Sequence, residues 1–212
     1  MKKRVGCIFI SWTLAIFVIQ PKISESFVHT SVTKMLSGSS SNDVKLINSS
    51  LLKLLKAQSI MAKALGLKEQ AELAKITAKG LESGDLGSEE GMEKNIDKSI
   101  EIQKEIGLAM AKNVVLDVKS KSLFATSLLP YGSGTFQMII ATRNAIETGK
   151  KVAKGDYMSG LKQSGTFIVL AKKGPSILST FSKATENIIK FAQNNGIPTD
   201  DLKEKMDKLW ST

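Results

Sequence analysis

The chain has 212 residues, of which 30 are basic and 20 acidic, and its net charge is +10. His29 is the only histidine and Cys7 the only cysteine, which excludes a metal site built from imidazole and thiolate ligands. Nearly all the basic residues are lysines, whereas arginine is the usual contact for nucleic-acid phosphates and bases, so we expect no nucleic-acid partner.

The N-terminus has the three parts of a secretory signal peptide. A basic start is followed by an uncharged run over residues 5–19 and then by two small residues, Ser24 and Ser26. We predict that residues 1–26 are a signal peptide cleaved after Ser26, which would make the protein periplasmic or secreted. The alternative is an uncleaved N-terminal helix that anchors the chain, although a bilayer span needs about 20 apolar residues and this run is shorter.

A low-complexity arm and then a helical domain are expected after the signal peptide. Residues 27–42 include a run of serine and glycine with little apolar surface to bury, so we predict a flexible N-terminal arm there. Residues 43–212 are expected to form one α-helical domain. This length is sufficient for a single domain with a substantial core.

Apolar residues at alternating steps of three and four predict two helices at the start of this domain. The first stripe runs from Val44 to Leu65, after Asp43 as a plausible N-cap. Gly66 interrupts the pattern, and an alanine-rich second stripe continues from Leu67 to Leu81.

The next predicted helix is the longest. It starts at Ser88, and its apolar stripe extends from Met92 to Val118 with the same spacing, so we expect the helix to run to about Leu128. Pro130 should stop it, because proline has no amide hydrogen and its ring clashes with the preceding turn.

Glycines divide the remainder of the chain. Between them the pattern predicts three shorter helices, at about 135–148, 157–172 and 175–194, and a final helix capped by Thr199. The whole predicts an all-α fold, a single-domain bundle of about five to seven helices built from antiparallel hairpins. The core candidates are Leu51, Leu54, Met61, Ile96, Ile100, Met110, Ile139, Phe167, Phe181 and Ile188.

Few residues suit catalysis, and we predict no catalytic, cofactor-binding or metal site. His29 lies in the predicted arm, where nothing would hold it as the base of a triad. The glycines near Gly134 lack the Lys-Ser/Thr ending of a phosphate-binding loop. Glu93 and Asp97 belong to a row of acids on one helix face, but lysines beside them indicate an ordinary solvated surface.

Two features point instead to binding. The apolar stretch 122–141, which Pro130 and two glycines divide, is predicted to form a hydrophobic hairpin, and a lysine-rich segment follows it. An apolar hairpin beside lysines is typical of membrane-surface proteins, and it is also compatible with the central core of a bundle. Trp210 either closes the core or anchors a partner. The candidate membrane or anion contacts are Lys150, Lys151, Lys154, Lys162, Lys172 and Lys173.

Three functional hypotheses follow. The first is an exported, non-catalytic helical protein that binds another macromolecule at the cell envelope, either a protein or an anionic polymer. The second is a lipid- or membrane-binding protein that uses the 122–141 hairpin and the lysines. The third is a carboxylate-dependent hydrolase of an envelope polymer, since two acids at a fixed separation suffice for such chemistry.

Overall fold

The computed structural model describes residues 40–83, 89–153 and 165–210. Within these ranges the chain forms six α-helices and no strand, so the predicted all-α fold is confirmed. The helices are α2 (Ser40–Ala64), α3 (Lys68–Glu82), α4 (Glu89–Ala111), α5 (Val118–Ala153), α6 (Gly165–Asn194) and α7 (Asp200–Trp210).

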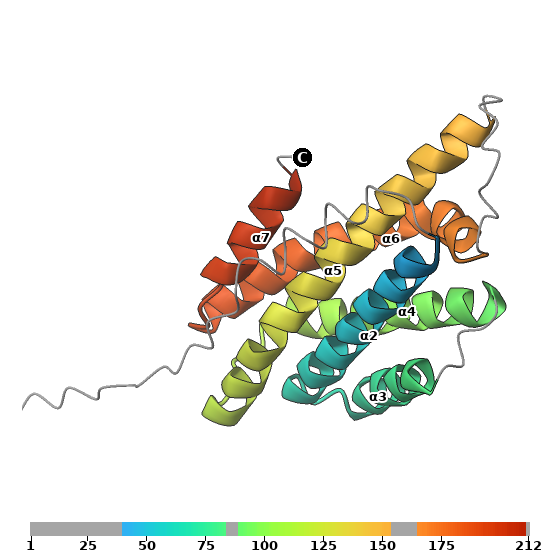
Figure 1. The fold of residues 1–212 in the computed structure, drawn as a ribbon. Helices are drawn as coiled ribbons and strands as arrows, with labels where there is room; N and C mark the ends of the chain where they lie inside the picture. Colours follow the sequence, from blue (N-terminus) through green and yellow to red (C-terminus); the bar gives the residue numbers. More distant parts are fainter. Residues whose placement is uncertain (1–39, 84–88, 154–164, 211–212) are drawn as a thin grey trace, which may run out of the picture.

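The helices pack in two layers, and each runs antiparallel to the one before it (Figure 1). One layer has the order α3, α2, α5 and α7, with α2 and α5 in the most extensive contact. The other layer consists of α4 and α6, which pack on each other; α4 also contacts α2 and α3, and α6 contacts α5. The three described turns, between α2 and α3, α4 and α5, and α6 and α7, therefore lie at the same end of the bundle.

The buried apolar side chains of all six helices form one core cluster. The stripes predicted from the three-four spacing provide its centre: nine of the ten predicted core residues are buried, and the tenth, Phe167, has a side chain outside the described part. Polar side chains join α2 to α4 within this core. Gln58 Nε2 donates to Ser99 O at 2.8 Å, and Ser99 Oγ donates to Gln58 Oε1 at 2.9 Å.

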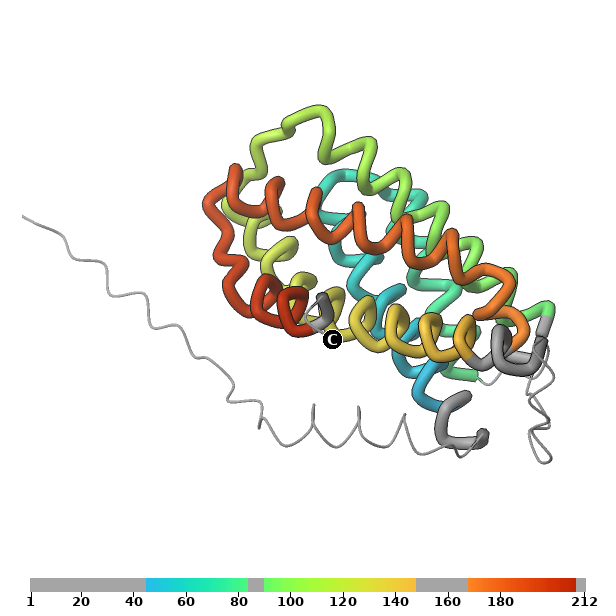
Figure 2. Tube along the Cα trace, turned by 90° about the horizontal axis from the view of Figure 1, so that it is seen from above, coloured from blue at the N-terminus to red at the C-terminus, as the bar shows by residue number. Residues whose placement is uncertain are grey.

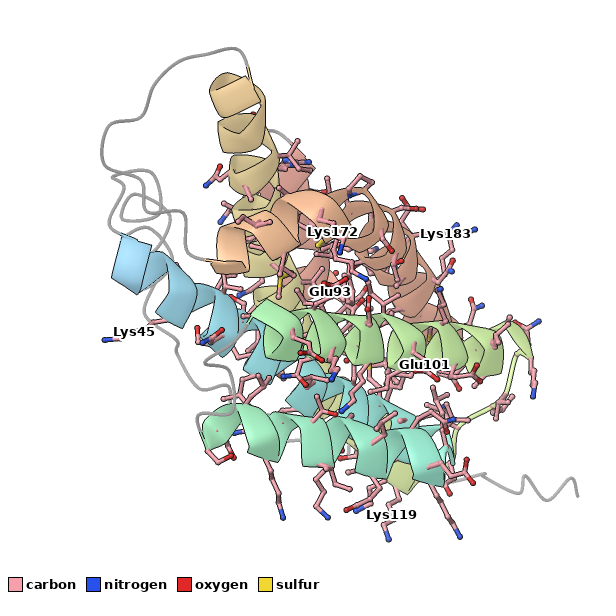
Figure 3. All side chains as sticks on the ribbon, turned by 90° about the vertical axis from the view of Figure 1, so that its right-hand side faces the viewer. Lys45, Glu93, Glu101, Lys119, Lys172 and Lys183 are labelled. Atoms are coloured by element: carbon pink, nitrogen blue, oxygen red, sulfur yellow. The ribbon has the colours of Figure 1, made fainter. Side chains whose placement is uncertain are left out.

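Pro130, which was predicted to stop a helix, and Pro175, the first residue of the helix predicted at 175–194, both lie inside helices. Pro130 is within α5 and Pro175 within α6, so the separate helices predicted at 135–148 and 175–194 are wrong. Pro130 deprives the carbonyl of Thr126 of its helical donor, but Thr126 is on the exposed side, where water can replace that donor. Burial of Phe124 and Tyr131 on the opposite side keeps α5 continuous. Figure 3 shows α6 changing direction close to Lys172, just before Pro175.

The glycines of this region serve helix packing and do not interrupt the helices. A Cβ on Gly134 would lie 2.9 Å from both Leu54 N and Ser50 O, so the backbones of α5 and α2 meet there. A Cβ on Gly174 would lie 2.6 Å from the Ile146 side chain, where α6 meets α5. Only glycine permits such close approaches, and this is the physical reason why these glycines occur in helix interiors.

Candidate functional site

The connection between α4 and α5 is where the structure differs most from the sequence prediction. The long helix expected to reach Leu128 ends at Ala111, and α5 begins at Val118. Asn113 adopts a left-handed conformation with φ of 52° and ends α4. Asp117 caps α5, because its Oδ1 accepts a hydrogen bond from Ser120 N at 2.6 Å.

Asn195, in the turn between α6 and α7, holds this connection in place. Its buried side chain accepts a hydrogen bond from Leu116 N through Oδ1 at 2.8 Å. Its Nδ2 donates to Phe191 O at 3.1 Å and to Val114 O at 3.5 Å. Leu116 itself is buried in the core. The connection therefore has a defined conformation although it contains no regular secondary structure.

Apolar side chains on either side of Leu116 are left uncovered. Among the described residues, six large hydrophobic side chains are exposed, and four of them lie between positions 108 and 118. We call these four the valine tip: Leu108, Val114, Val115 and Val118, with exposed fractions of 60%, 44%, 84% and 87%. Figure 2 shows the α4–α5 connection at the outer edge of the bundle, next to the end of α6.

Three lysines, the tip lysines, flank the valine tip: Lys112, Lys119 and Lys121. None of the ion pairs in the described part of the chain includes them. The one acid of this segment is Asp117, whose pKa is lowered first by the hydrogen bond from the Ser120 backbone, then by that from the Ser120 side chain, and less by Lys119. Three lysines against this one aspartate give the segment a net positive charge.

The two candidate lysines whose side chains the structure describes contact α4. Lys172 Nζ lies 3.2 Å from a Glu93 oxygen, and Lys173 Nζ lies 3.1 Å from Glu93 and 2.8 Å from Asp97. Figure 3 labels Lys172 on α6 and Glu93 on α4, where the two helices meet. Hydrogen bonds from Lys173 and Lys172 lower the pKa of Glu93, and those to Asp97 and Glu93 raise the pKa of Lys173. These pairs connect the two helices of the second layer.

The other candidate residues can be placed only in part. Lys150 and Lys151 lie in the last turn of α5, and Trp210 is the last residue of α7, but their side chains are outside the described part. Lys154 and Lys162 lie outside the described residues, as does the predicted signal peptide. The structure thus brings together only Lys172 and Lys173 from this set.

The stretch 122–141 does not form the predicted hairpin, whereas its alternative assignment to the core of the bundle is confirmed. This stretch is part of the single helix α5, and Phe124, Leu128, Met138 and Ile139 are all buried in the core. Its apolar character reflects the central position of α5 between α2 and α6. Because this face is covered, it offers no surface for a membrane in this conformation.

The sequence analysis did not predict the valine tip, because Val114 and Val118 continue the apolar spacing of α4. The signal that could have revealed it is the pair Asn113 and Asp117. Asparagine is common at a left-handed helix end, and aspartate is a strong N-cap, so the two residues mark a helix end and a new helix start four positions apart.

Comparison with known protein families, curated proteins and solved structures finds no match for this chain. None of the described helices has a stretch of sufficient length and hydropathy to cross a bilayer. In the same part of the chain, no group of three or more histidine, cysteine, aspartate or glutamate side chains is arranged to hold a metal ion.

Proposed function

We propose that this protein is exported to the cell envelope and acts there by binding another macromolecule, without catalysing a reaction. The observation that carries the proposal is the valine tip. Exposed aliphatic side chains that gather in one segment, beside charged residues, are characteristic of interaction sites. Isolated exposed apolar residues would carry no such meaning, but here four occur within eleven positions.

The fixed conformation of the connection supports the same proposal. A loop that is already held by Asn195 and by the buried Leu116 loses little conformational freedom when a partner covers it. Export is proposed from the basic and apolar N-terminus, and a retained N-terminal anchor is the alternative.

The carboxylate-dependent hydrolase has less support. Its general acid would need a raised pKa, as burial in an apolar pocket produces. The pKa of Glu93 is instead lowered, by hydrogen bonds from Lys173 and Lys172. Glu93 therefore favours its charged form, which suits ion pairing between helices and does not suit proton donation.

Site-specific photo-cross-linking in living cells tests the proposal. A photoreactive residue replaces Val115 in the full chain, and in a matched chain it replaces Ile76, an exposed apolar residue on α3. We expect a discrete adduct, with a protein or with lipid, from position 115 and none from position 76. Equal or absent labelling at the two positions would refute the proposal, as would a turnover that copurifies with the protein and is abolished by a single carboxylate change.

A further inference from the structure

We infer that the valine tip docks on the surface of a bilayer that contains anionic lipid. The inference rests on the proposed function and names the partner, and it assigns the contact to Leu108, Val114, Val115 and Val118 with Lys112, Lys119 and Lys121. It places the membrane contact at the α4–α5 connection and away from the buried apolar face of α5.

Charge complementarity is the first argument for an anionic surface. Residues 108–121 contain three lysines and one aspartate, and the aspartate is engaged as the cap of α5. Lys119 lies far from the contact between Glu93 and Lys172 in Figure 3, so Glu93 does not neutralise it. Lysines close to an anionic leaflet each contribute favourably to binding, and their long stems let the ammonium groups reach the headgroups.

The second argument is the combination of these lysines with exposed aliphatic side chains. Val115, in the α4–α5 connection, and Val118, the first residue of α5, have most of their surface in water. Figure 2 shows this connection at the outer edge of the bundle. Apolar side chains on a positively charged projection can enter the boundary between headgroups and acyl chains while the lysines stay among the headgroups. Leu116 and Asn195 hold the backbone from the core side, so the valines are already displayed before contact.

A protein partner fits the composition of the tip less well. Centres of protein–protein interfaces are rich in tryptophan, tyrosine and arginine and depleted in lysine. Residues 108–121 contain none of the first three and three lysines. A second copy of this chain is also disfavoured, because a two-fold contact would place the same lysines of both copies against each other.

Depth-dependent fluorescence quenching can test the inference on the full chain. Cys7→Ser removes the only native cysteine, and Val115→Cys then allows one fluorophore to be attached at the tip. The matched chain carries Ile76→Cys in place of Val115→Cys. Each protein is mixed with vesicles whose acyl chains carry a quencher, either with a phosphatidylglycerol fraction or with phosphatidylcholine alone. An N-terminal anchor, if retained, would tether both proteins equally and would not by itself bring position 115 to the acyl chains.

We expect quenching at position 115 in the anionic vesicles, with much less in neutral vesicles and none at position 76. Replacing the three tip lysines with glutamine should weaken binding, so that the half-saturating lipid concentration rises by roughly 100-fold at low salt. The control is a triple variant in which three exposed lysines elsewhere, Lys79, Lys98 and Lys183, are replaced with glutamine. It has the same net charge as the tip variant and should retain most of the binding to anionic vesicles.

Three results would overturn the inference: no quenching at position 115, equal quenching at 115 and 76, or equal weakening by the two triple variants. If one of these occurs while cross-linking in cells still gives a discrete protein adduct at Val115, the proposed binding function stands and only its membrane partner is wrong. If neither experiment gives a signal, the proposed function falls as well.

Discussion

The α2–α5 interface and the valine tip contain similar aliphatic residues, but those of the interface are buried and those of the tip are exposed. At the interface, Gly134 lets the backbones of α5 and α2 approach each other, and Leu51 and Leu54 are completely covered. At the tip, Val115 and Val118 have no covering helix among the described residues. The difference shows that apolar character alone does not assign a residue to the core. What decides is whether a neighbouring helix comes close enough to exclude water.

Both regions are nevertheless held by buried polar contacts. At the interface, Ser50 Oγ donates to Leu46 O at 2.6 Å and approaches Gln137 Oε1 at 3.1 Å. At the tip, Asn195 makes the corresponding link between Leu116 and the end of α6. A segment that only connected α4 to α5 would not need exposed valines, because polar residues could connect the helices equally well. The comparison therefore predicts that mutations at the interface affect stability and that mutations at the tip affect binding.

The largest effect is expected from Gly134→Ala. The added Cβ would lie 2.9 Å from backbone atoms of Leu54 and Ser50, which cannot move as a flexible side chain can. We expect the free energy of unfolding to fall by about 3 kcal/mol, as measured by chemical denaturation. The control is Gly107→Ala, where no atom lies within 4 Å of the new Cβ, and its helix position should make that variant more stable by about 0.5–1 kcal/mol. Equal effects of the two substitutions would show that α2 and α5 are not in close contact.

A smaller effect is expected from Asn195→Ala. The change leaves Leu116 N without its acceptor in a buried position and removes the donor to Phe191 O, which should cost about 2 kcal/mol. Hydrogen exchange at the Leu116 amide should accelerate at least tenfold, which corresponds to the free energy of about one hydrogen bond. The neighbouring exposed Asn194 provides the control, since Asn194→Ala should leave exchange at Leu116 unchanged. Unchanged exchange in Asn195→Ala would mean that the connection is not held from α6.

The ion pairs between α4 and α6 should have a still smaller, pH-dependent effect. Because the pKa of folded Glu93 is lowered, its stabilising contribution is complete above its ordinary value of 4.5 and disappears as the pH falls through the folded value. The pKa of Lys173 is raised, so its contribution is present below 10.5 and disappears as the pH rises further.

The difference in stability between the native chain and Glu93→Gln should therefore be constant near neutral pH and vanish in acid. Denaturation curves over a pH series measure it, and Glu101→Gln, an exposed acid of the same helix outside this cluster, is the control. A difference that persisted in strong acid would contradict the ion-pair explanation.

The smallest effect on stability is expected at the tip. Val115→Asp combined with Val118→Asp should change the free energy of unfolding by no more than about 0.5 kcal/mol, because both side chains are already in water. The same pair should lose binding to anionic vesicles, whereas Ile76→Asp combined with Ile168→Asp, on other exposed surfaces, should retain it. A large loss of stability in the tip variant would mean that the valines belong to the core after all.

The sequence predicted the fold class and most of the core because regular spacing reports burial directly. The stripes of α2 and α6 lie in the core as expected, with residues such as Leu54, Met61, Phe181 and Ile188 buried. A left-handed turn with φ of 76° lies at Gly66, where this glycine interrupts the predicted stripes, and Gly196 follows α6 with φ of 70°. Spacing of this kind depends only on the helix period and on which face meets the core.

The sequence could not predict features that depend on the neighbouring helix. Pro130 and Gly134 both lower helix propensity, and nothing local reveals that packing of α5 against α2 compensates for them. Val114 and Val118 continue the spacing of α4, and their exposure follows only from the end of that helix at Ala111. The candidate site could not be predicted for the same reason, since it consists of apolar residues that the fold leaves uncovered.

Hydrogen exchange of the full chain, in the presence and absence of phosphatidylglycerol-containing vesicles, shows which surface of the protein the membrane covers. We expect slower exchange at residues 112–118 and no change at residues 68–82 of α3. Slowing in α3 or another helix face, with none in the α4–α5 connection, would contradict this expectation.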